Sequence, residues 1–92
     1  MTAAIRLIIE GKVQGVGYRA WLSTQAKSAS LCGWVRNRRD GTVEAVISGD
    51  AKTLSIFIKS CWQGPMAARV DKIIDEQYSG PVPPNFEVLP TI

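Results

Sequence analysis

Apolar and polar residues alternate in two stretches of the chain, and this alternation predicts two β-strands. Residues 5–10 and residues 43–48 each place an apolar side chain at every second position, which is the period of a strand with one buried face. Asp40-Gly41 stands just before the second stretch, and this dipeptide is a strong hairpin signal. On the other side of the turn, Trp34 and Val35 are therefore expected to open the partner strand and to lie in the core.

Two other stretches carry apolar residues at the spacing of an amphipathic helix. Trp21 lies beside the first helical face, and Gly33 is expected to end that helical region. Asp50 is a residue type that caps a helix N-terminus, and Gly64-Pro65 predicts the end of the second helix. The two helical faces consist of Tyr18, Leu22, Ala26 and Ala29, and of Leu54, Phe57, Ile58 and Cys61.

The rest of the chain completes a small α+β domain. β-branched residues in 68–76 predict a fourth strand, three prolines and a glycine in 79–85 predict a loop, and 86–89 is a candidate for a short last strand. The order βαββαβ is that of the ferredoxin-like split βαβ fold, an antiparallel sheet with two helices on one face. We expect residues 1–92 to form a single domain of this kind.

Composition and charge are those of an ordinary soluble protein. Of the 92 residues, 46% are hydrophobic and 21% are charged, and the net charge is +3. The apolar stretch at residues 5–9 is too short for a signal peptide or a membrane helix. Two cysteines, Cys32 and Cys61, do not make a disulfide framework. We therefore expect a cytoplasmic protein, monomeric by default, with no membrane association.

The absence of histidine narrows the chemistry that the chain can perform. A chain without histidine cannot carry a Ser-His-Asp triad, a Cys-His pair or a zinc site with histidine ligands. Two cysteines alone do not hold zinc either, so we expect no metal and no cofactor. The basic cluster of Arg36, Arg38 and Arg39 is most simply a solvated hairpin, and nucleic acid is not an expected partner.

A glycine-rich segment, residues 11–17, lies between the first predicted strand and the first predicted helix. Glycine accepts positive φ and lets backbone amides approach an anion closely. The helix that follows adds unpaired N–H groups and the positive end of its dipole. Arg19, in the first turn of that helix, adds a guanidinium fork. The segment is therefore a candidate phosphate site, and a glycine-rich turn without a ligand is the alternative.

Three known motifs are candidates for parts of this sequence, and each fits poorly. No Gly-Lys-Ser/Thr sequence ends the loop, so it is not a Walker A motif. Gly15, Gly17 and Ala20 satisfy a loose dinucleotide-binding pattern, but the chain is too short for the usual doubly wound sheet. Cys32 and Arg38 have the Cys-x5-Arg spacing of cysteine phosphatases, yet the residues between them predict a strand, which cannot wrap an anion. Cys32 is instead expected to be a small buried thiol at a strand start.

Two long motifs resemble those of the acylphosphatase family. The sequence GKVQGVGYR at residues 11–19 is similar to the family signature Gly-x-Val-Gln-Gly-Val-x-[Tyr/Phe]-Arg, and GWVRNRRDGTVE at residues 33–44 is similar to the second signature. The segments GPMAARV at residues 64–70 and FEVLPT at residues 86–91 also resemble that family. Tyr18 stands where phenylalanine is common in the family. The resemblance covers nearly the whole chain.

The resemblance implies an enzyme that hydrolyses acyl phosphates to a carboxylate and orthophosphate. It implies that Arg19 binds the phosphoryl group and that Asn37 holds the attacking water. Phosphoryl transfer depends mostly on positioning and fixed charge, so such a site can work without histidine or a metal. Phosphate or sulfate is the expected product-like ligand. The expected backbone donors are the amides of Gln14, Gly15, Val16, Gly17, Tyr18 and Arg19.

Two other functions stay open on the sequence alone. RNA-binding domains combine a similar sheet with two helices, and Trp34 or Phe86 would be their stacking platforms, although no RNP-type motif is present. The chain also resembles a domain that acts within a larger carbamoyl-transfer protein, but we expect a free-standing enzyme. The sequence does not select among acetyl phosphate, carbamoyl phosphate, 1,3-bisphosphoglycerate and a protein aspartyl phosphate as substrate.

Overall fold

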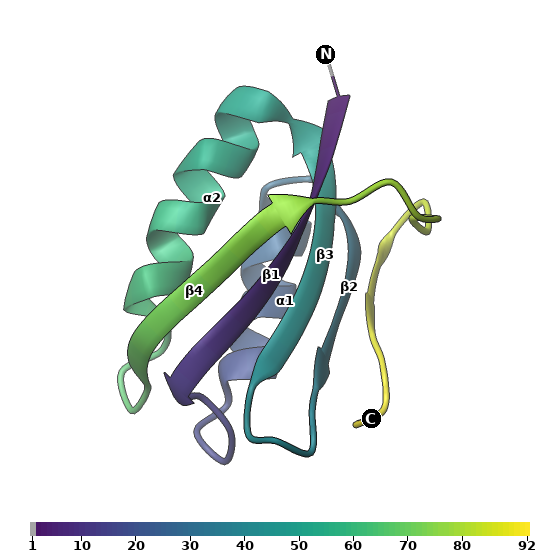
Figure 1. The fold of residues 1–92 in the computed structure, drawn as a ribbon. Helices are drawn as coiled ribbons and strands as arrows, with labels where there is room; N and C mark the ends of the chain where they lie inside the picture. The colour runs from purple at the N-terminus through teal and green to yellow at the C-terminus, as the bar shows by residue number, and fades with distance from the viewer. Residues whose placement is uncertain (1) are drawn as a thin grey trace.

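A computed structural model describes residues 2–92 and shows one sheet covered on a single face by two helices (Figure 1). This arrangement confirms the predicted ferredoxin-like α+β fold. None of the helices in the described residues is long and apolar enough to cross a membrane. Along the chain, the elements are β1 Thr2–Lys12, α1 Tyr18–Ser28, β2 Cys32–Asn37, β3 Val43–Asp50, α2 Ala51–Gln63, β4 Arg69–Gln77 and β5 Phe86–Val88.

The sheet has the strand order β4-β1-β3-β2-β5. The two stretches with alternating apolar residues, β1 and β3, pair with each other in antiparallel fashion, with Ile5 opposite Ile47. Neighbouring strands are antiparallel except at one edge, where β5 pairs in parallel with β2. The predicted short last strand is thus confirmed, and it extends the sheet to five strands.

The turn predicted at Asp40-Gly41 connects β2 and β3. Gly41 has a φ of 93°, a left-handed conformation that glycine adopts without strain. The Asp40 carboxylate accepts hydrogen bonds from the backbone N–H of Thr42 at 3.0 Å and from its hydroxyl at 2.6 Å. At the base of the turn, the Arg38 N–H donates to the Thr42 carbonyl at 2.9 Å. The turn therefore holds β2 and β3 in a fixed register.

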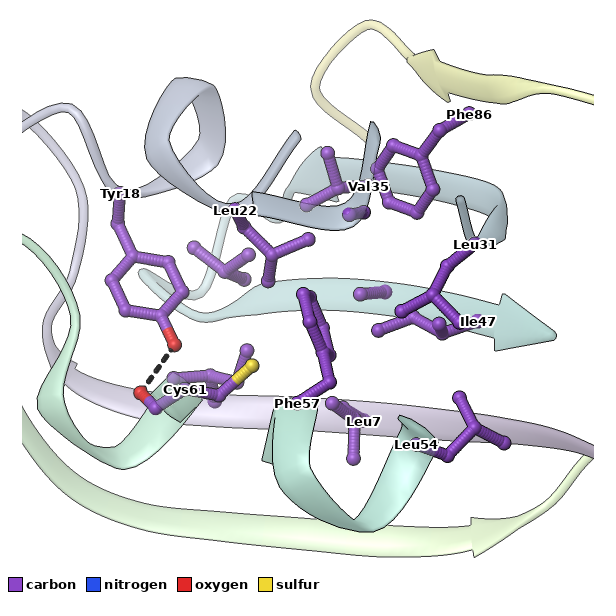
Figure 2. Packing of buried hydrophobic residues seen from close by; sticks show 14 of the residues in the cluster. Leu7, Tyr18, Leu22, Leu31, Val35, Ile47, Leu54, Phe57, Cys61 and Phe86 are labelled. Carbon is purple, nitrogen blue, oxygen red and sulfur yellow. Dashed lines mark hydrogen bonds between the residues drawn. The ribbon is translucent and has the colours of Figure 1, made fainter. Parts of the chain in front are cut away.

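The core lies between the sheet and the two helices (Figure 2). The helical faces predicted from spacing supply Leu22 from α1 and Phe57 from α2, and the sheet supplies Leu7 and Ile47. Asp50 caps α2 as predicted, because its carboxylate accepts from the backbone N–H groups of the next turn. Both helices are consequently anchored on the same face of the sheet.

Three local predictions were wrong. Gly33 lies inside β2 instead of ending the first helix, and a Cβ there would stand 1.8 Å from the Val46 carbonyl oxygen. The helix ends earlier, and the chain reverses through Ser30 at a φ of 58°. Trp34 is half-buried outside the core, because alternation with buried Val35 turns it to the opposite face of the sheet. Cys32 begins β2 as expected, but it is only half-buried.

The first strand also continues beyond residue 10, where the glycine-rich segment was predicted to end it. β1 runs through Gly11 to Lys12, with an irregularity between Glu10 and Gly11 in its pairing with β4. Gly11 has a φ of 133°, and a Cβ at this position would lie 2.1 Å from the Arg69 carbonyl oxygen. This glycine is therefore required for close strand pairing, and the loop before α1 begins only at Val13.

Candidate active site

A hollow of about 170 Å³ opens where the β1–α1 loop meets the end of β2. Both segments lie at the same end of the sheet (Figure 1). Arg19 and Asn37, which come from different motifs, therefore line one hollow. Val16 does not line it, since its side chain packs against the core. The lining residues are Val13, Gln14, Gly15, Gly17, Tyr18, Arg19, Ala20 and Asn37.

Two glycines shape the backbone on the loop side of the hollow. Gly15 and Gly17 have φ values of 75° and 80°, a region that residues with a Cβ rarely adopt. No atom lies within 4 Å of the place where a Cβ would stand at either glycine. Backbone conformation, and not lack of space, is therefore the reason for glycine at both positions.

The backbone N–H groups around these glycines are available to a ligand. Gly17 occupies the N-cap of α1 and provides no side-chain cap, so the first N–H groups of the helix have no partner of that kind. In residues 2–92, the amides of positions 15–18 donate to no protein acceptor. A loop with several free amides next to a helix N-terminus is a favourable environment for an anion.

Arg19 lies in the first turn of α1 and is half-buried. Its Nη1 donates to the carbonyl oxygen of Leu89 at 3.3 Å, which ties the guanidinium to the segment after β5. A cation near a helix N-terminus is unfavourable unless a negative group lies nearby. The first turn of α1 contains no acidic residue. The loop, the helix end and the guanidinium thus add their positive potentials in one place.

Asn37 ends β2 and contributes the polar side chain opposite the loop. Its Oδ1 is buried and accepts no hydrogen bond within the described residues. Buried polar atoms without a partner are rare in folded proteins. The backbone of Asn37 is fixed, because its carbonyl oxygen accepts from the Ile92 N–H at 3.1 Å. Asn37 lines the hollow, and its Oδ1 is a buried acceptor that no protein donor within the described residues satisfies.

Comparison with known proteins identifies the family. A sequence model of the acylphosphatase family matches residues 5–88. The chain belongs to the acylphosphatase family. The acylphosphatase of Azorhizobium caulinodans is 46% identical over an alignment that includes all of both chains. That of Rhodopseudomonas palustris (strain ATCC BAA-98 / CGA009) is 53% identical over 77 residues, 83% of this chain and 78% of the relative.

Solved acylphosphatase structures have the same fold. The acylphosphatase of Coxiella burnetii aligns with a TM-score of 0.90 at 32% identity, over 96% of this chain and 93% of the other. The acylphosphatase of Bacillus subtilis gives the same TM-score and identity over 97% and 99% of the two chains. The fold also forms 12% of the full-length HypF chain, with a TM-score of 0.90 at 24% identity.

Membership of the acylphosphatase family settles the class of the protein. The chain is an enzyme, and its family and fold support the hydrolysis of acyl phosphates. This confirms the enzymatic class that the two signature motifs implied. The comparisons support the enzyme and not the alternative of a non-catalytic RNA-binding module.

The basic cluster within the second acylphosphatase motif is not simply solvated. Arg36 Nε donates to Glu44 Oε1 at 2.7 Å, and the guanidinium stacks 4.7 Å from the centre of the Trp34 ring. Arg38 lies 3.8 Å from the Asp40 carboxylate. Arg36 is two residues after Trp34 in the same strand, so it lies with Trp34 on the face of the sheet opposite the helices. The prediction of a solvated hairpin was therefore wrong for Arg36.

Sequence reasoning missed two contacts that hold the site together. One is the Arg19 bond to the Leu89 carbonyl, and the other is the pair of hydrogen bonds that the Gln14 side chain makes with the β2–β3 turn. Both join residues far apart in the chain. The only signal for them in the sequence is that Gln14 and Arg19 stand within a motif, which does not reveal what their side chains contact.

Proposed function

We propose that the hollow binds the phosphoryl group of an acyl phosphate and that Asn37 orients the water that attacks it. The observation that carries this proposal is the unpartnered, buried Oδ1 of Asn37 on the same hollow as Arg19 and the glycine loop. An unsatisfied acceptor and a set of unpartnered donors, on residues that line one small hollow, suit a water molecule and an anion side by side. The family supports the same chemistry.

The phosphoryl group is held by the loop amides and by Arg19. The proposed donors are the backbone N–H groups of residues 14–19, together with the guanidinium nitrogens that the Leu89 carbonyl does not occupy. Charge in the transition state spreads over the equatorial phosphoryl oxygens, and fixed donors stabilise it without reorganising. Inorganic phosphate and sulfate are expected to bind in the same place. The solved structure of HypF, which has this fold, is of a phosphate- and nucleotide-bound form.

Asn37 contributes geometry and takes no proton. Its side-chain amide has a donor group and an acceptor oxygen, so it can fix a water molecule without becoming charged. The water oxygen attacks phosphorus in line with the acyl oxygen. The bond between phosphorus and the acyl oxygen breaks, its electron pair leaves with the carboxylate, and the water proton passes to a phosphoryl oxygen. The products are a carboxylate and orthophosphate.

The reaction requires no strong acid and no added metal in this proposal. A carboxylate is a weakly basic leaving group, so it departs without protonation. A hollow of about 170 Å³ has room for the phosphoryl group and leaves most of an acyl group outside. We therefore expect broad tolerance of the acyl group. We also propose a monomer in a reducing cytoplasm, where Cys32 and Cys61, both free in the described structure, stay reduced.

Hydrolysis of benzoyl phosphate, followed by ultraviolet absorbance with EDTA present, tests these roles. We expect rapid turnover by the wild type. Arg19→Gln should lower kcat/KM by about 1,000-fold, because charged donors to the phosphoryl oxygens are lost. Asn37→Ala should lower kcat by about 100-fold or more, because the water loses its orientation.

Two matched variants control for nonspecific effects. Arg39→Gln removes an exposed arginine of the neighbouring turn, and Asn85→Ala removes an exposed asparagine before β5. Both should retain wild-type kcat and KM. An inactive but folded wild type, or full activity in Asn37→Ala, would overturn the proposal.

A further inference from the structure

The side chain of Gln14 leaves the glycine loop and contacts the β2–β3 turn. Its Nε2 donates to the Arg38 carbonyl oxygen at 2.7 Å and to the Thr42 carbonyl oxygen at 2.8 Å. A side-chain amide has two N–H donors, so both are used. The two acceptors are the carbonyls at the base of the turn, where Arg38 and Thr42 already bond to each other through the backbone. The Gln14 side chain is therefore bonded to the part of the turn that a backbone hydrogen bond already closes.

These bonds join the two halves of the proposed active site. The phosphate donors belong to the loop after β1, and Asn37 is the last residue of β2, directly before Arg38. β1 and β2 are not neighbours in the sheet, because β3 lies between them. No ladder hydrogen bond therefore joins β1 to β2 directly. Within residues 2–92, the two bonds from Gln14 are the hydrogen bonds that connect this loop to the turn.

The separation of these halves sets the distance between the attacking water and the phosphorus atom. A water held by Asn37 must stand close to the phosphorus atom and in line with the leaving carboxylate. A displacement of about 1 Å in such an arrangement can lower the rate on the order of 100-fold. No atom packs against Gly15 or Gly17 from the Cβ side.

We propose that Gln14 is a positioning residue that sets the water held by Asn37 in line with the phosphoryl group bound by the loop. The inference rests on the proposed role of Asn37. Gln14 contributes its backbone amide to the loop and its side chain to the turn, so one residue defines both ends of the attack distance. Its side chain acts through Asn37 and does not itself touch the reacting atoms.

Steady-state kinetics on benzoyl phosphate separate this role from general support of the loop. Gln14→Leu should lower kcat about 10- to 100-fold. Inhibition by inorganic phosphate should change by less than about threefold, because the loop amides and Arg19 that bind the anion are retained. Gln14→Met keeps the length of the side chain without adding a charge and removes both donors, and it should cause a similar loss. Gln63→Leu, at an exposed glutamine near the end of α2, should behave as the wild type.

A double-mutant cycle with Asn37→Ala supplies the second readout. Once Asn37 is absent, no oriented water remains for Gln14 to place, so Gln14→Leu should lower the residual kcat by less than about twofold. An equal loss in both backgrounds, or a phosphate inhibition constant that weakens in step with kcat, would show that Gln14 only stabilises the loop and would overturn the inference. If Asn37→Ala alone keeps full activity, the proposed function fails instead, and this is read from that single variant. Urea unfolding of each variant identifies any that do not fold. If Gln14→Leu does not fold, Gln14→Met takes its place in both measurements.

Discussion

At the scale of single residues, Tyr18 connects the two helices. It is the first residue of α1 and is buried, and its hydroxyl donates to the Cys61 carbonyl oxygen at 2.6 Å (Figure 2). Cys61 lies in the last turn of α2, where carbonyls have no intrahelical partner. The Tyr18 hydroxyl of α1 thus provides a donor for a carbonyl oxygen at the C-terminal end of α2. Burial raises the pKa of Tyr18 far above its usual value, and burial raises the pKa of the Cys61 thiol to about 12.

Replacement of Tyr18 by phenylalanine isolates this hydrogen bond. Tyr18→Phe should lower the free energy of unfolding by about 1–2 kcal/mol, because the Cys61 carbonyl is left buried without its donor. Urea unfolding followed by circular dichroism measures the difference. Tyr78→Phe is the matched control, since the Tyr78 hydroxyl makes only an exposed contact of 3.4 Å with the Pro81 carbonyl oxygen. Equal stability of Tyr18→Phe and the wild type would contradict the assignment.

At the scale of elements, a network of ion pairs around Glu44 connects four strands on the face opposite the helices. Glu44 of β3 accepts from Arg6 of β1 at 2.6 Å and from Arg36 of β2 at 2.7 Å. Arg6 also pairs with Glu76 of β4. The side chain of Glu44 is only 5% exposed. A charge this buried is stable only because both of its oxygens are paired.

The pKa of Glu44 gives the sheet a defined acid sensitivity. Burial alone would raise this pKa, but hydrogen bonds from Arg36 and Arg6 outweigh burial and hold it below its usual value. The ionised carboxylate therefore stabilises the fold above its unfolded pKa of about 4.3. That stabilisation is lost as pH falls through the lower pKa of the folded state.

Replacing Glu44 by glutamine tests the direction of this pKa shift. At pH 7, Glu44→Gln should lower the free energy of unfolding by about 1–3 kcal/mol, because two guanidinium groups lose their shared partner. The difference from the wild type should shrink as the pH is lowered below about 4. Urea unfolding over a series of pH values measures it. Glu87→Gln, at an exposed position of β5, should show neither effect, and a difference that grows toward low pH would contradict the assigned pKa shift.

At the scale of the whole molecule, the hollow exists only in the folded chain. It joins the β1–α1 loop and the end of β2, and both are braced by the segment after β5 through Leu89 and Ile92. The unfolded chain has no comparable cluster of donors. An anion that binds the hollow must therefore stabilise the native state.

Inorganic phosphate should raise the thermal stability of the protein in a saturable manner. At 100 times its dissociation constant, phosphate should add about 2.7 kcal/mol to the free energy of unfolding. Thermal unfolding over a phosphate titration measures this, with chloride at matched ionic strength as reference. Arg19→Gln should lose most of the effect and Arg39→Gln should retain it. An equal shift in both variants would mean that phosphate acts on the whole surface and not at the hollow.

The sequence by itself determined the elements, their order and the identity of the family. Alternation with a period of two and helical spacing are local properties, so β1, β3, α1 and α2 could be read without knowing what each packs against. Arg19, Asn37 and the glycine loop were likewise visible as two motifs. That both motifs line one hollow became visible only in the folded chain, where strand order brings the β1–α1 loop and the end of β2 together.

The tertiary structure decided which side chains meet across the chain. Trp34 lies opposite the core, Gly33 faces the Val46 carbonyl, and Gln14 reaches the turn, because strand order and register bring these partners together. The parallel partner of β5 was also undetermined until strand order was known. The physical reason is that periodicity records only whether a side chain is buried. Hydrogen-bond partners of buried polar groups depend on distances of about 3 Å between segments remote in sequence, and only the folded chain defines such distances.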